Sequence, residues 1–122
     1  MRDLKAAGQL LNTEEPLSDV VGFHAQQAVE KLLKALLVYH GVEFEKVHTI
    51  RYLMDLCVKY AGELELLREH AEPLTRYAVQ ERYPLPGSEV TIEEAVSAVE
   101  AAHRIREVVF RHLPPDCRED RT

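Results

Sequence analysis

The sequence is poor in the residues that build disulfide-stapled or membrane-spanning proteins. Its 122 residues include two cysteines, Cys57 and Cys117, no tryptophan and 7% aromatic residues. Two cysteines are too few for a disulfide framework, which favours reduced thiols. No apolar run reaches the ~18 residues that span a membrane, and the N-terminus lacks the apolar stretch of a secretion signal. We therefore expect a cytoplasmic protein that does not enter a membrane.

The chain also lacks an excess of basic residues. Its net charge is −6, which argues against a generally basic nucleic-acid-binding surface but leaves room for a local basic patch. With 46% hydrophobic and 30% charged residues, the composition is that of an ordinary globular protein. We expect one domain over residues 1–115, followed by a charged, frayed tail over residues 116–122.

Familiar metal and phosphate motifs are missing as well. The sequence has no Cys-x-x-Cys, no His-Glu-x-x-His and no glycine-rich phosphate loop. Two Glu-x-x-His spacings occur, Glu45/His48 and Glu100/His103, but chance alone predicts about one in a chain so rich in Glu. We expect these to be surface or capping histidines, and we expect no metal and no cofactor.

What the sequence does have is helical periodicity. Apolar residues recur every three or four positions in the segments 2–12, 18–40, 49–61, 63–80 and 91–113. Pro73 predicts a break near Ala71, and Thr91 with Glu94 predicts a capping box. Residues 81–88 read as an ordered turn, and no segment alternates as a strand does. These features predict an all-α fold, an antiparallel four- or five-helix up-and-down bundle.

The second helical segment carries a polar strip along an otherwise apolar helix. Its members recur every three or four residues, and they are His24, Gln27, Glu30, Lys31 and Lys34. The strip has two interpretations. It is either a solvated face in which Glu30 and Lys34 support the helix, or a groove that binds an anionic ligand. The long helices are apolar over more than one face, so a dimer that shares helix faces is expected.

The turn at Arg82 and Tyr83 favours the ligand interpretation. The Arg82 guanidinium suits a phosphate or carboxylate, and the Tyr83 ring can stack on a base. The alternative is that Arg82 only ties the turn to a helix carboxylate such as Glu30. The residue pattern alone leaves both open.

Four stretches of the chain resemble one family, the HEPN domains. Residues 23–37, which read FHAQQAVEKLLKALL, resemble the signature helix with its pattern Gln-Ala-x-Glu-Lys-x-x-Lys-Ala. Residues 48–53 resemble the segment that opens the family's next helix. Residues 82–84 match its Arg-Tyr-Pro turn, and residues 91–95 resemble the start of its last long helix. The resemblance spans about residues 3–113, nearly the whole chain.

The resemblance implies a small helical bundle, commonly a homodimer, encoded in prokaryotes beside a minimal nucleotidyltransferase. Such pairs often form toxin–antitoxin modules. Some members are metal-independent ribonucleases, whereas others bind a nucleotide or the partner protein without cleaving anything. Our first hypothesis is a non-catalytic subunit of the second kind. Its ligand-binding residues would be Gln27, Glu30, Lys31, Lys34, His48, Arg82 and Tyr83.

Two alternatives remain. The ribonuclease members carry Arg-x(4–6)-His late in the domain, and Arg106 and His112 fit that spacing. In a dimer, His112 could act as general acid or base while Arg106 stabilises the phosphorane charge. The same two residues could instead be cations that complement the helix C-terminus. The other alternative is a structural dimerising bundle with no ligand.

Overall fold

The protein is all-helical wherever its structure is described. The computed structural model describes residues 2–11, 18–47, 49–78 and 90–117, and within these ranges it has no strand. Three short 3-10 segments accompany the α-helices: η1 (Gly62–Leu67), η2 (Glu72–Tyr77) and η3 (Pro115–Cys117). The α-helices are α1 (Arg2–Leu11), α2 (Ser18–Tyr39), α3 (Ile50–Cys57), α4 (Arg68–Ala71) and α5 (Ile92–Arg111). The predicted helical bundle is confirmed.

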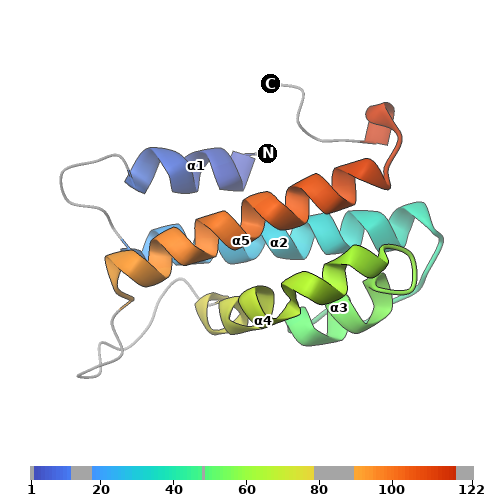
Figure 1. Ribbon diagram of the computed structural model, residues 1–122, viewed down its shortest axis with the longest axis horizontal. Helices are drawn as coiled ribbons and strands as arrows, with labels where there is room; N and C mark the ends of the chain where they lie inside the picture. Colours follow the sequence, from blue (N-terminus) through green and yellow to red (C-terminus); the bar gives the residue numbers. More distant parts are fainter. Residues whose placement is uncertain (1, 12–17, 48, 79–89, 118–122) are drawn as a thin grey trace.

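Successive long segments alternate in direction (Figure 1). Helix α1 runs opposite to α2, and α2 and α5 lie side by side with the same direction. The backbone N–H of Val90, just before α5, donates to Asp19 Oδ1 in the first turn of α2 at 3.1 Å. This bond ties together the ends at which the two long helices begin. The segment from η1 to η2 runs in the opposite direction and contacts both α2 and α5, and α3 packs against it.

Local signals in the sequence fix the ends of the long helices. Thr91 and Glu94 make both bonds of the capping box at the start of α5. Helix α2 ends at Tyr39, and Gly41 two residues later has a φ of +69° that glycine adopts without strain. Around it, the N–H of Val42 donates to Leu37 O and that of Gly41 to Val38 O. These two bonds form a Schellman turn, so the last turn of α2 has a defined geometry.

The region predicted as one broken helix over residues 63–80 differs in detail. A break does occur at Ala71, next to Pro73. On either side of the four-residue α4, however, the backbone is 3-10 rather than α-helical. Pro73 has no N–H to donate, so the tighter 3-10 turns begin there. Residues 79 and 80, and the predicted turn at 81–88, lie outside the described residues.

Helix α2 lies at the centre of the core and contacts α1, α3, α5 and η2. The core is a layer of aliphatic side chains from α2, α3 and α5, and its fully buried members include Leu33, Leu36, Leu53 and Ile105. No described helix is long and apolar enough to cross a membrane. A helix packed on four partners leaves little free surface, which limits where α2 can meet a ligand.

Candidate functional site

Three members of the polar strip on α2, Gln27, Glu30 and Lys34, belong to a largely buried chain of hydrogen bonds. Glu30 is only 4% exposed, and its carboxylate accepts hydrogen bonds from two side chains on its own helix. The amide of Gln26 donates to Glu30 Oε2 at 2.7 Å, and Lys34 Nζ donates to Oε1 at 2.6 Å. The Gln27 amide adds a longer bond of 3.3 Å to Gln26 Oε1. Glu30 is therefore an internal support for Lys34, not a member of a solvated face.

The other two members of the strip, His24 and Lys31, join α2 to α1. Asp3 Oδ1 lies 2.9 Å from His24 Nδ1, and Asp3 Oδ2 accepts a hydrogen bond from Lys31 Nζ. Burial alone would raise the pKa of Asp3, but the hydrogen bonds from Lys31 and His24 outweigh it and hold that pKa below its ordinary value. Asp3 is thus a charged anchor that holds α1 in place and positions Lys31.

The two lysines meet at a hollow of about 470 Å³ along the last turns of α2. Lys31 and Lys34 have side chains that are 50% and 27% exposed. Each carries three N–H donors and uses one on its carboxylate, so donors remain for a ligand. We call this the lysine hollow, and its lining residues are Lys31, Lys34, Ala35, Val38, Tyr39 and Cys117.

The lysine hollow combines the chemistry that an anionic ring-bearing ligand requires. Its apolar wall includes Val38, which is 68% exposed, and Tyr39, which is 48% exposed. Singly exposed apolar side chains are common on protein surfaces, but these two lie beside two lysines in one hollow. Cys117, in the turn of η3, also lines the hollow.

The structure brings together only part of the predicted site. Lys31 and Lys34 line the lysine hollow, whereas Gln27 and Glu30 belong to the hydrogen-bonded chain that ends at Lys34. His48, Arg82 and Tyr83 lie outside the described residues, so their predicted roles stay predictions. Sequence reasoning missed Asp3 and Gln26. The i, i+4 spacing of Gln26 and Glu30 was the available signal for Gln26, whereas nothing local marked Asp3 as a partner of α2.

The residues of the ribonuclease alternative have separate partners within the chain. The Arg106 guanidinium lies over the Phe110 ring at 4.8 Å, one turn further along α5. His112 caps the end of α5, and its Nε2 lies 2.9 Å from Glu63 Oε1. A hydrogen bond from the backbone of Glu63 and a second one with His112 lower the pKa of the Glu63 carboxyl. His112 is therefore engaged with an acid at the end of the bundle.

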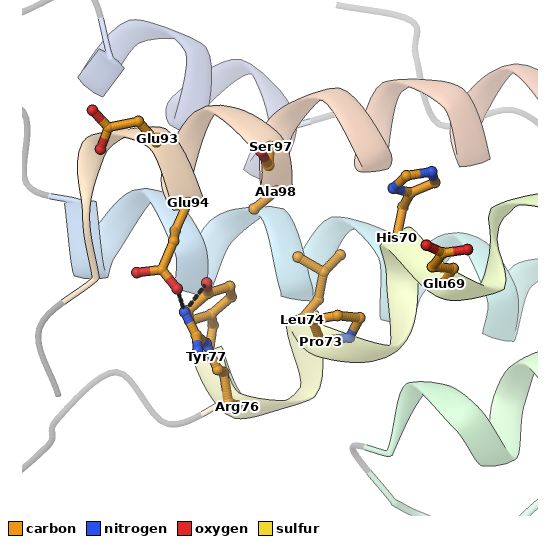
Figure 2. A pocket seen from close by; sticks show the side chains of 10 residues that line it. All are labelled: Glu69, His70, Pro73, Leu74, Arg76, Tyr77, Glu93, Glu94, Ser97 and Ala98. Atoms are coloured by element: carbon orange, nitrogen blue, oxygen red, sulfur yellow. Dashed lines mark hydrogen bonds and ion pairs between the residues drawn. The ribbon is translucent and has the colours of Figure 1, made fainter.

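A second hollow, of about 320 Å³, lies at the opposite end of α5 (Figure 2). Figure 2 shows Arg76 bridging Glu94 on α5 and the Tyr77 hydroxyl, to which it donates at 2.7 Å. Its floor is apolar and includes Leu74, while Glu93 lies at its rim. Among its described lining residues, three glutamates accompany one arginine, so this hollow suits an anion less well than the lysine hollow does.

Metal and thiol chemistry find little support in the described part of the chain. Within residues 2–11, 18–47, 49–78 and 90–117, no three His, Cys, Asp or Glu side chains are gathered as metal ligands would be. Cys57 is fully buried and its thiol donates to Leu33 O at 3.3 Å. Burial raises the pKa of Cys57 to about 12, so it stays a neutral thiol in the core.

Comparison with known proteins agrees with the helical fold and the signature helix. The HEPN domain family matches residues 1–113. One similar protein is "Putative toxin MJ1304" of Methanocaldococcus jannaschii, which is 30% identical over 121 residues. The match covers 88% of this chain and 78% of that protein. No solved structure matches the chain significantly. The chain belongs to the HEPN domain family.

Proposed function

We propose that this chain is the HEPN subunit of a toxin–antitoxin-type pair and that it binds a nucleotide at the lysine hollow. The observation that carries the nucleotide proposal is the placement of Lys31 and Lys34 beside the exposed Tyr39 ring. A phosphate can accept from both ammonium groups, and a base can lie against the ring and the aliphatic wall. The similarity to a protein named as a toxin supports the pairing.

Lys31 and Lys34 are each paired with a carboxylate, and these pairs determine the charge and the rigidity of the proposed site. Asp3 and Glu30 offset the charge of the lysines, so the hollow has little net positive field to attract anions from a distance. They also fix the two ammonium groups before a ligand arrives, which lowers the entropy lost on binding. We therefore propose a site that recognises phosphate by geometry. A minimal nucleotidyltransferase partner and a homodimer are part of the same proposal.

Calorimetric titration with ATP tests the nucleotide site. Lys31→Gln and Lys34→Gln remove a charge while keeping a hydrogen-bond donor, and each should weaken ATP binding about tenfold, since a charge-assisted hydrogen bond contributes about 1.5–3 kcal/mol. Lys46→Gln is the matched control, because Lys46 is an exposed lysine outside the hollow. Equal ATP affinity in all three variants and the parent protein would refute the nucleotide site.

Incubation with RNA in EDTA separates this proposal from the ribonuclease alternative. The non-catalytic proposal predicts that the RNA stays intact. It is supported by the engagement of His112 with Glu63 and of Arg106 with Phe110 within the chain. Cleavage that disappears in His112→Ala would establish the ribonuclease instead, and cleavage that persists in that variant would point to a contaminating nuclease.

A further inference from the structure

The lysine hollow continues into a row of exposed rings that nucleotide binding alone does not use. The Tyr39 ring meets the His40 ring edge to face at 5.0 Å between centroids. His40 in turn stacks on Tyr60 at 4.2 Å, with 18° between the ring planes. Tyr60 is 37% exposed. Three rings from two separate elements thus form one continuous aromatic surface that begins at the wall of the hollow.

The backbone holds this aromatic row in a defined place. Tyr39 and His40 precede the Schellman turn at Gly41, which fixes the end of α2. Tyr60 follows α3, where its N–H donates to Cys57 O at 2.9 Å and that of Ala61 donates to the same oxygen at 3.0 Å. Cys57 is itself bonded to α2 through Leu33. Both sides of the row are therefore anchored to the same helix.

The chemistry of this surface matches a polymer in which negative charges alternate with flat rings, as in a nucleic acid strand. Cations gather at one end of the row, at Lys31 and Lys34, and Lys59 is an exposed cation beside Tyr60 at the other. Three adjoining rings offer more surface than one base can cover. Aromatic rings beside lysines are how proteins bind unpaired nucleic acid without reading its sequence.

We propose that the lysine hollow and the aromatic row together bind a single-stranded nucleic acid segment. Its phosphates contact Lys31 and Lys34, one base lies against Tyr39, and a neighbouring base stacks at Tyr60. This inference rests on the proposed nucleotide site, which it extends from one nucleotide to a strand. A protein partner with an apolar surface is the competing occupant, and it predicts that an octamer binds no tighter than a mononucleotide.

Fluorescence anisotropy with labelled octamers of deoxythymidine and uridine tests the strand proposal. We expect the deoxythymidine octamer to bind at least tenfold more tightly than thymidine monophosphate, because more than one base can stack. Tyr60→Leu should weaken octamer binding about tenfold and leave ATP binding at the hollow unchanged. The two sugars show whether the site distinguishes RNA from DNA. Since the protein lacks tryptophan, quenching of tyrosine fluorescence by the unlabelled octamer gives a second, direct readout of stacking.

The control variant is Ile92→Ala, which removes an exposed apolar side chain at the start of α5, far from the aromatic row (Figure 1). It should change octamer binding less than twofold, and thermal unfolding should show that both variants stay folded. An octamer that binds no tighter than the monophosphate, or binds equally to Tyr60→Leu, overturns the strand proposal even if ATP still binds. If ATP binding also fails, the nucleotide site itself is wrong.

Discussion

At the residue scale, Gly22 on α2 leaves room for the Tyr77 ring on η2. A Cβ on Gly22 would lie 3.0 to 3.3 Å from three ring atoms. Arg76 holds that ring through the Tyr77 hydroxyl and by lying over its face at 4.8 Å. The ring therefore has little freedom to move away, and only glycine fits at this position.

We predict that Gly22→Ala destabilises the protein by about 1 kcal/mol. Overpacking costs about 1–3 kcal/mol, which exceeds the ~1 kcal/mol gained from the better helix propensity of alanine. Gly8→Ala on α1 is the matched control, since nothing lies within 4 Å of its Cβ, and it should stabilise the fold. Urea unfolding measures both. Stabilisation by Gly22→Ala in the parent protein would contradict this packing, whereas stabilisation in a Tyr77→Leu background is expected.

Glu30 and Lys31 are neighbours on α2 with very different surroundings. Glu30→Ala should lower the free energy of unfolding by about 2–3 kcal/mol, because it removes the carboxylate to which the buried Gln26 amide and Lys34 both donate. Lys31→Ala should cost less than about 1 kcal/mol, because its ion pair with Asp3 is half exposed on the lysine side. Equal denaturant midpoints with equal slopes would show that Glu30 is not a structural support.

The two thiols should differ sharply in reactivity. Cys57 is buried with its pKa raised to about 12, whereas Cys117 is exposed at the lysine hollow. At pH 8, a thiol reagent such as iodoacetamide should modify Cys117 in the native protein and Cys57 only after unfolding. Mass spectrometry of the labelled peptides reports the sites. Equal native labelling of the two cysteines would mean that the α3 core opens readily.

At the element scale, α1 is held to α2 by charge as well as by apolar packing. Asp3 accepts from Lys31 and contacts His24, while Leu4 and Ala7 bury apolar surface. Apolar packing is insensitive to pH, but the Asp3 contacts are not. The pKa of Asp3 in the folded protein lies below its ordinary value of 3.8. Ionised Asp3 therefore stabilises the fold at pH values above 3.8. This stabilisation is lost as the pH falls through the folded-state pKa.

Asp3→Asn should therefore destabilise the protein at pH 7, and the difference from the parent protein should shrink as the pH is lowered below about 3.8. Denaturant unfolding across this pH range measures the effect. Glu43→Gln, which alters an exposed carboxylate, is the control. A difference between parent and Asp3→Asn that does not depend on pH would mean that the Asp3 charge does not anchor α1.

Elements with strong local signals could be predicted from the sequence, and those shaped by distant contacts could not. The Thr91–Glu94 capping box and the Gly41 helix end are short-range features, and both are confirmed. The 3-10 backbone around α4 was missed, because helical periodicity of three or four residues does not distinguish 3-10 from α-helix. Pro73 marked the break but not the conformation on either side.

The same distinction applies to the candidate site. The spacing on α2 correctly placed Lys31 and Lys34 on one surface, because a helix converts spacing directly into a shared face. It could not show that Glu30 is buried, since burial depends on which helices pack there. The spacing also could not show that Asp3 bonds to Lys31, or that Cys117 from the other end of the chain lines the same hollow.

At the scale of the whole molecule, the two hollows described above differ in their chemistry. The lysine hollow lies along the last turns of α2, and the hollow of Figure 2 lies between η2 and the start of α5. In the second, Arg76 is paired with Glu94, and Glu69 and Glu93 add negative charge. These carboxylates make the second hollow less suited to an anionic ligand than the lysine hollow, where Asp3 and Glu30 are matched by two lysines.

The most direct test of this account is a backbone-amide NMR titration of the full chain with ATP. The account predicts that the largest shift changes gather at residues 31–39 and at Cys117, and that they vanish when Lys31 and Lys34 are both changed to Gln. Changes that gather instead around residues 69–77 and 93–98, or no changes at millimolar ATP, would contradict it.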